Sequence, residues 1–201
     1  MHDVGIYENL ILGIHFLLLK KCKIFDEKTI VTCYTGRSMR IKVRKHERRG
    51  YQSIKMSNIL EKQFLKQRND FEKSCVERDK KYHFPQGVIF ETDIAYAKDK
   101  NKAHRLDRYR PKGKETQILP VIINVHGGGL LLGNKEFNKY FCALLSKKGF
   151  LVYSMEYRLI PDCTFFDQLR DIFLAMDFVK EHAAADGGDL SHVYLVGDSG
   201  G

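Results

Sequence analysis

Short apolar runs alternate with helical patterns over the second half of the chain. The runs occupy residues 118–125, 150–155 and 193–196. Between them, apolar residues recur at helical spacing, first at Phe137, Phe141, Leu144 and Leu145 and then at Leu169, Ile172, Phe173, Met176 and Val179. Uninterrupted apolar strands separated by amphipathic helices are typical of parallel strands buried on both faces. The pattern predicts a βαβαβ unit with right-handed crossovers, and hence an α/β fold.

A second, weaker pattern precedes this unit. Apolar residues recur among charges at Leu60, Phe64, Phe71 and Cys75, which predicts an amphipathic helix over about 57–80. Residues 88–97 are expected to form a strand, and residues 106–109 a further one. The intervening segments are polar connectors.

Charge divides the chain into two parts. The sequence of 201 residues holds 34 Lys and Arg against 25 Asp and Glu, a formal net charge of +9. Residues 1–55 contribute 12 basic and 5 acidic side chains, so the remainder is close to neutral. We therefore expect residues 1–55 to be a basic N-terminal extension and residues 56–201 to be the N-terminal part of the folded domain. The basic cluster at residues 37–49 of the extension has no aromatic residues among its charges, so no nucleic-acid partner is expected.

The basic extension has a second interpretation. Arg48-Arg49 can be encoded by a ribosome-binding sequence, and Met56 comes shortly afterwards. Residues 1–55 are then upstream sequence read in frame, and Met56 is the true start. A genuine extension or cap segment is the alternative.

Composition also bears on cellular location. The five cysteines form no CxxC pair and are odd in number, so reduced thiols in a cytoplasmic protein are expected. The apolar run at 10–19 is too short to span a bilayer, which needs about 20 residues. Neither a membrane span nor a metal site is predicted, and the pattern does not indicate an oligomeric state.

Two glycine-rich motifs come directly after predicted strands. Gly197-Asp198-Ser199-Gly200-Gly201 has the form GxSxG, in which a sharp strand-to-helix turn exposes the serine as a nucleophile. His126-Gly127-Gly128-Gly129 offers backbone N–H groups that can approach an oxyanion closely. A turn or flexible loop is the alternative for either motif alone. Together, in this order along the chain, they predict acyl-transfer chemistry.

With these motifs, residues 57–201 resemble the α/β-hydrolases of the hormone-sensitive-lipase type, the bacterial esterases and lipases with HGGG and GDSAGG signatures. Residues 157–162 (YRLIPD) are similar to the family's YRLAPE, and residues 165–171 to its FPAALED. Residues 104–107 and 109–111 look like its HRLDVYRP stretch. The resemblance implies a three-layer αβα fold around a mostly parallel sheet, incomplete at the C-terminus.

The resemblance also implies roles for single residues. Ser199 is the expected nucleophile of a carboxylic-ester hydrolase that needs no cofactor and acts on small-molecule esters. The amides of Gly127, Gly128 and Gly200 are expected to form the oxyanion hole. His126 would orient the glycine loop, and Gly129, Gly197 and Asp198 complete the two supporting motifs.

The sequence departs from the family beyond the serine. In this fold the triad acid and base come after the nucleophile, and the sequence ends two residues after Ser199. We therefore expect residues 1–201 to have little or no activity and the complete protein to be the esterase. A non-catalytic truncated or pseudo-hydrolase that binds a partner is the alternative. The remaining histidines are expected to be structural or at the surface.

Three further motifs have structural or rival interpretations. GDSGG also occurs in trypsin-like proteases, but those are all-β proteins, which the predicted parallel strands contradict. Residues 186–189 (DGGD) resemble part of a calcium loop and are expected to be a helix-to-strand turn. Glu156 and Arg158 are expected to pair at a strand end as part of the scaffold.

Overall fold

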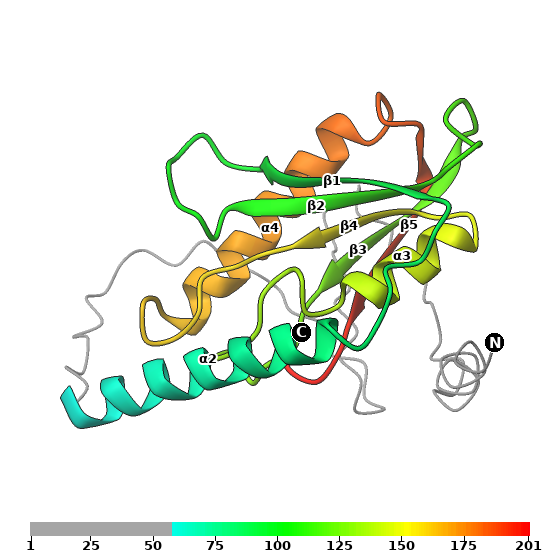
Figure 1. Ribbon diagram of the computed structural model, residues 1–201. Helices are drawn as coiled ribbons and strands as arrows, with labels where there is room; N and C mark the ends of the chain where they lie inside the picture. Colours follow the sequence, from blue (N-terminus) through cyan, green and yellow to red (C-terminus); the bar gives the residue numbers. More distant parts are fainter. Residues whose placement is uncertain (1–57) are drawn as a thin grey trace, which may run out of the picture.

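The computed structural model describes residues 58–201, so the predictions for the basic extension lie outside the described residues. A five-stranded sheet organises this part of the chain, in the order β1-β2-β4-β3-β5 (Figure 1). The strands are β1 (Val88–Ala95), β2 (Arg105–Pro111), β3 (Leu119–Val125), β4 (Leu151–Met155) and β5 (Gly188–Gly197). Strand β2 runs antiparallel to both of its neighbours, β1 and β4, whereas β4, β3 and β5 are parallel to one another. The predicted α/β fold with a mostly parallel sheet is confirmed.

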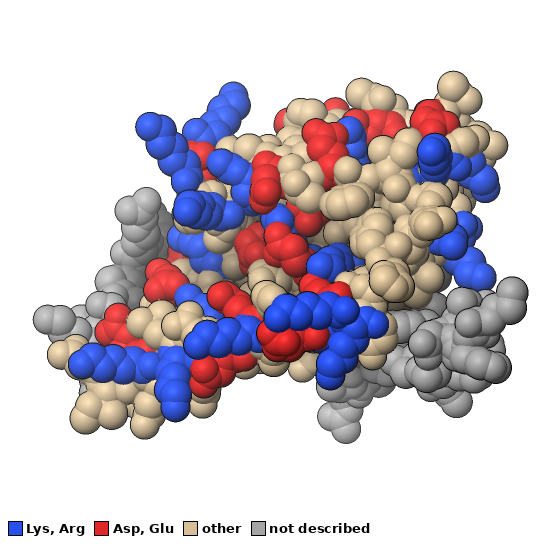
Figure 2. Space-filling model, viewed as in Figure 1, with Lys and Arg blue, Asp and Glu red and all other residues tan. Residues whose placement is uncertain are grey.

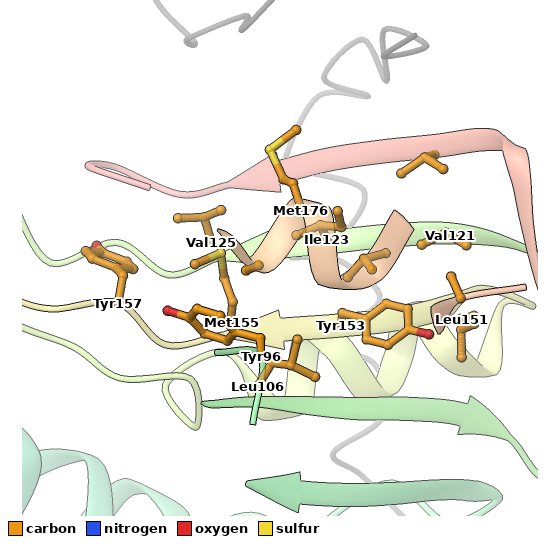
Figure 3. Packing of buried hydrophobic residues seen from close by; sticks show 14 of the residues in the cluster. Tyr96, Leu106, Val121, Ile123, Val125, Leu151, Tyr153, Met155, Tyr157 and Met176 are labelled. Atoms are coloured by element: carbon orange, nitrogen blue, oxygen red, sulfur yellow. The ribbon is translucent and has the colours of Figure 1, made fainter. Parts of the chain in front are cut away.

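Helices cover the two faces of the sheet. Along β3 and β4, alternate residues point to opposite faces, so that Ile123 and Tyr153 join one hydrophobic cluster while Ile122 and Val152 join the other. Helix α4 (Phe165–His182) packs on the first cluster, part of which is shown in Figure 3. Helix α3 (Lys139–Lys147) packs on the second. This gives the helix, sheet and helix layers of an αβα arrangement.

The helices are where predicted, but their buried faces differ from the predicted ones. Helix α3 buries Cys142, Ala143 and Ser146, and the larger residues beside them are only partly buried. Helix α4 buries Gln168, Asp171, Ala175, Met176 and Val179, whereas the predicted core residue Phe173 is 36% exposed. Small and polar residues lie closest to the sheet because they let the helix approach it and bond to the adjoining loops.

Helix α2 (Asn58–Asp79) confirms the predicted amphipathic helix, although none of its residues is fully buried. Its partly buried residues include Phe64, Phe71 and Cys75, whereas Leu60 is 46% exposed. The ring of Phe71 packs on that of Phe137 with centroids 5.1 Å apart, just before α3 begins. Acidic and basic side chains are interspersed along this helix in Figure 2, so its visible face has no single sign of charge. Within 58–201, no helix combines the length and apolar character that a membrane span requires.

Candidate active site

The strand register brings the two glycine-rich motifs together. Val125 at the end of β3 lies opposite Met155 of β4 on one side and opposite Gly197 of β5 on the other. The residues directly after these strand ends therefore emerge side by side at one edge of the sheet. They are His126, Glu156 and Asp198.

The serine turn has the strained geometry that its motif predicts. Ser199 is exposed and has a φ of 52°, a left-handed conformation that is uncommon for residues with a side chain. Gly197 and Gly201 pack against each other, because a Cβ on Gly197 would collide with the Gly201 carbonyl carbon. On the other side, a Cβ on Gly201 would collide with the Val125 carbonyl oxygen. The absence of side chains at these glycines lets the turn fold tightly against the end of β3 and present the serine hydroxyl.

The glycine loop after β3 has one occupied and two free N–H groups. The Gly127 N–H donates to Asp198 Oδ1 at 3.0 Å, so it is not available to an oxyanion. Gly128 and Gly129 have φ values of 125° and 60°, which turn the backbone away from strand geometry. Within residues 58–201, neither of their N–H groups has a hydrogen-bond acceptor. This bond contradicts the expectation that the Gly127 N–H is free for an oxyanion, whereas the Gly128 and Gly129 N–H groups are free among the described residues.

Gly200 lies against this loop. A Cβ added to it would lie 3.2 Å from the Gly129 nitrogen, which is closer than an ordinary contact. The glycine at this position therefore leaves room for the loop to lie directly over the serine turn. The backbone of Gly200 therefore lies beside the Gly129 N–H.

His126 is held inside the loop and does not face the serine. Its side chain is completely buried, with Nε2 donating to Glu156 Oε1 at 3.0 Å and Nδ1 lying 2.8 Å from the Gly127 carbonyl oxygen. The ring stacks on Tyr157 at 4.3 Å, and the Tyr157 hydroxyl donates to the His126 carbonyl oxygen at 2.8 Å. Burial raises the pKa of Tyr157, which keeps this hydroxyl protonated as a donor. Both imidazole nitrogens are thus engaged, so this ring orients the loop and is not a base for Ser199.

A buried lysine fixes the far part of the loop. The Lys135 N–H donates to Glu156 Oε2 at 3.0 Å, so one carboxylate holds both His126 and Lys135. The Lys135 ammonium, only 5% exposed, lies 3.0 Å from Asp107 Oδ1 of β2. Burial alone would lower the pKa of Lys135, but hydrogen bonds to Glu136 and Asp107 raise it above its usual value. Sequence patterns missed this anchor, because polar residues in a loop carry no periodic signal.

The predicted pair between Glu156 and Arg158 is wrong. Glu156 bonds to His126, whereas Arg158 turns to helix α4 and donates from Nε and Nη2 to the two carboxylate oxygens of Asp171, at 2.8 and 2.7 Å. The Arg158 backbone N–H donates to the same carboxylate at 3.0 Å. These hydrogen bonds raise the pKa of Arg158 further above its usual value. The two residues therefore belong to different networks.

Gln168 of α4 joins the two loops that frame the serine turn. Its side-chain amide donates to the Leu130 and Arg158 carbonyl oxygens, each at 2.9 Å, and the residue is 1% exposed. The Leu130 carbonyl also accepts the Ile160 N–H at 3.0 Å. Gln168 was missed by sequence reasoning; a glutamine beside an otherwise apolar helix face was the one available signal.

Helix α2 contacts the same two loops through one arginine. Arg68 donates to the carbonyl oxygens of Leu131 and Ile160, at 3.3 and 2.9 Å. Its third contact is an ion pair with Asp162 at 2.8 Å, in which the aspartate is 59% exposed. The helix therefore lies beside the edge of the sheet that carries the glycine loop (Figure 1).

The other described histidines that form bonds lie in different networks. His104 lies in the connection before β2, where Nδ1 bonds to Asp99 Oδ2 at 2.7 Å. His182 bonds to the Phe178 carbonyl oxygen at the end of α4, and His192 bonds to Asp189 near the start of β5. The last two lie towards the edge of the sheet opposite Ser199, since β5 runs from Gly188 to Gly197.

The described residues contain no group of three or more acidic, histidine or cysteine side chains that could hold a metal ion. The DGGD segment lies at the junction of α4 and β5, as expected, with Asp186 and Gly187 in the turn and Gly188 and Asp189 at the start of the strand. In this turn Asp186 accepts the Tyr153 hydroxyl at 2.6 Å and pairs with Arg108. Its carboxylate is thus committed to structural contacts.

Comparisons with known proteins agree with this geometry. Residues 106–201 match the family model BD-FAE. A probable isoprenylcysteine alpha-carbonyl methylesterase, ICMEL1, from Oryza sativa subsp. japonica is 36% identical over 98 residues, which cover 49% of this chain and 23% of that protein. Tuliposide A-converting enzyme 2 from Tulipa gesneriana is 33% identical over 94 residues, 41% of this chain and 25% of that protein. The chain thus spans about a quarter of the length of the curated relatives it matches.

Solved structures show the same likeness. An inhibited esterase B from Lactobacillus rhamnosis superposes with a TM-score of 0.68 at 28% identity, over 71% of this chain and 46% of that one. A bacterial heroin esterase superposes with a TM-score of 0.57 at 26% identity, over 65% of this chain and 41% of that one. Fold, motifs and relatives agree that the described residues have an α/β-hydrolase fold and that the chain is similar to esterases of the hormone-sensitive-lipase type.

Proposed function

We propose that Ser199 is the nucleophile of a serine carboxylesterase to which this chain contributes the serine turn and the oxyanion hole. The observation that carries the proposal is the left-handed Ser199 in a turn that packs against the glycine loop, where, among the described residues, the Gly128 and Gly129 N–H groups have no acceptor. Free donors next to an exposed hydroxyl suit the negative oxygen that forms when an ester carbonyl is attacked. The Gly200 N–H is the proposed third donor.

The proposed reaction has two steps. The Ser199 oxygen attacks the ester carbonyl carbon, the bond to the alcohol oxygen breaks, and the alcohol leaves with the serine proton. Water then attacks the acyl-enzyme, releasing the carboxylic acid and returning a proton to Ser199. The general base and its acid partner are proposed to come from outside residues 58–201, because His126 is committed to the glycine loop and His104, His182 and His192 lie in other networks.

Short or medium acyl esters are the proposed substrates. One similar protein supports this class in its name, an esterase B inhibited by a tributyrin phosphonate, because butyrate is a short acyl group. Lipase activity on long acyl chains would be a finer distinction, tested by comparing acetate, butyrate and palmitate esters.

The test is p-nitrophenyl acetate hydrolysis by the full-length gene product, its Ser199→Ala variant and residues 1–201. We expect turnover that Ser199→Ala abolishes, and little or none from residues 1–201, in which His104, His126, His182 and His192 are bound to other partners. Ser191→Ala is the matched control, since Ser191 is exposed on β5, the strand that precedes the serine turn, and bonds to Asp189. Turnover that survives Ser199→Ala would refute the assignment.

A non-catalytic hydrolase-like binding protein is the second candidate, favoured by the commitment of His104, His126, His182 and His192 to other partners. A full-length product that folds but shows no Ser199-dependent turnover would support it. We also propose a cytoplasmic location, supported by the free thiols of Cys75, Cys142 and Cys163. Cell fractionation would test it.

A further inference from the structure

One carboxylate oxygen of the serine turn binds both ends of the oxyanion loop. Asp198 Oδ1 accepts the Gly127 N–H at 3.0 Å and the Asn138 side-chain amide at 2.7 Å. Gly127 begins the loop that leaves β3, and Asn138 ends it as the residue before α3. Residues 127–138 are thereby closed into a ring across the carboxylate.

Asn138 bonds to Asp198 and does not cap helix α3 with its side chain. As the residue that caps α3, its side chain would ordinarily accept a backbone N–H of the first helical turn. It makes no such bond here and donates to Asp198 instead. The α3 N-terminus thus forgoes its side-chain cap, and the asparagine is directed to the serine turn.

The loop turns sharply at two glycines, which adopt positive φ readily, and is strained at the leucine that follows them. Gly128, Gly129 and Leu130 have consecutive φ values of 125°, 60° and 70°, the last being unusual for a residue with a side chain. A hydrogen bond to a carboxylate is stronger than one between neutral groups. Two such bonds at one oxygen fix where the strained segment begins and ends.

We propose that Asp198 and Asn138 are positioning residues that hold the glycine loop against the serine turn. They do so by engaging Gly127 and leaving the next two N–H groups free for the oxyanion. The inference rests on the proposed esterase function for its catalytic consequence, but the clamp itself is a property of the fold. Neither residue touches the reacting atoms; both act through the loop.

The first measurement needs no activity. Amide hydrogen exchange, followed by NMR in the full-length gene product, should show a protected Gly127 N–H and rapidly exchanging Gly128 and Gly129 N–H groups. Asp198→Ala and Asn138→Ala should each speed Gly127 exchange by about 10-fold or more, because its acceptor is lost or released. Asp198→Asn should keep most of the protection, since its amide oxygen can accept both bonds.

The second measurement is steady-state hydrolysis of p-nitrophenyl acetate. Asp198→Ala is expected to lower kcat by roughly 100-fold, the effect of misplacing oxyanion donors, with KM within about 3-fold. Asn138→Ala is expected to lower kcat by about 10-fold, and Asp198→Asn to restore kcat to within about 5-fold of wild type. Asn69→Ala, exposed on α2, is the matched control for loss of an asparagine.

The outcomes separate the clamp from the esterase function. Unchanged Gly127 exchange in both alanine variants overturns the clamp, as does an unchanged kcat in an active enzyme. If the wild-type protein shows no Ser199-dependent turnover, the esterase proposal fails, and the exchange measurement alone decides whether the clamp exists. A fall in stability with kcat equal to that of the wild type would assign both residues a structural role only and overturn their positioning role.

Discussion

Two arginine–aspartate pairs in this fold have nearly equal lengths and very different burial, which makes them a test of how burial sets the energy of an ion pair. Asp171 is completely buried and binds Arg158 at 2.7 Å, whereas Asp162 is 59% exposed and binds Arg68 at 2.8 Å. We predict that Asp171→Ala destabilises the protein by about 3 kcal/mol and Asp162→Ala by about 0.5 kcal/mol.

The larger value reflects the groups that the substitution leaves without a partner. Asp171→Ala removes the acceptor of the Arg158 guanidinium and of the Arg158 backbone N–H together. Losing one partner of a buried pair costs about 3–5 kcal/mol, and the lower end applies here because the Arg158 side chain is 27% exposed. In Asp162→Ala, solvent replaces the lost carboxylate, and Arg68 keeps its two backbone acceptors.

The assay is urea denaturation followed by circular dichroism. With a slope of about 2 kcal/mol per molar urea, the midpoint should fall by about 1.5 M for Asp171→Ala and by about 0.25 M for Asp162→Ala. Asp171→Asn keeps the volume and one acceptor, so its midpoint should lie between the two. Equal midpoints for the two alanine variants would refute the claim that burial decides the cost.

Three other predictions concern the helices and one thiol. Thr164→Ala removes the N-cap of α4, which accepts the Asp167 N–H, and should cost about 1 kcal/mol. Hydrogen bonds from Thr164 lower the pKa of Asp167 below 3.8, so the ionised Asp167 stabilises the fold above pH 3.8, and this stability is lost as pH falls through the native pKa of Asp167. NMR titration of Thr164→Ala should show a higher Asp167 pKa than in the wild type. An unchanged pKa would contradict the capping contribution. Burial raises the pKa of Cys142 to about 12, so iodoacetamide at pH 8 should modify it only after unfolding, as peptide mass spectrometry can check. Arg68→Ala should speed proteolysis within α2, while Lys66→Ala, at an exposed position of the same helix, should not.

The sequence patterns were sufficient to locate the central strands and the two glycine motifs that follow strands. The central parallel strands β3 and β4 are buried on both faces, so their sequences are almost entirely apolar, as in residues 121–125, where Asn124 is the one polar residue. The two glycine motifs come directly after strand ends, so their positions depended only on locating those strands. The order of strands in the sheet, with β3 between β4 and β5, then placed them side by side.

The polar anchors were beyond the reach of periodicity. Gln168 and Asp171 lie on the buried side of α4, where the pattern predicted larger apolar residues such as Phe173. Their burial is favourable because each satisfies loop groups that would otherwise lack partners. Such pairings depend on where distant loops meet, which is information that no local window contains. The same holds for the Gly127 N–H, whose acceptor lies 71 residues away in sequence.

The level ends of β3, β4 and β5 have a consequence for how this sequence can change in length. His126, Glu156 and Asp198 meet because Val125 stands opposite Met155 and Gly197. Deleting one residue within β3 would retract His126 by about 3.3 Å and exchange the two faces of the strand. Extra residues in a surface connection leave that alignment intact. Insertions and deletions in relatives or engineered variants should therefore concentrate between the strands and be excluded from within β3.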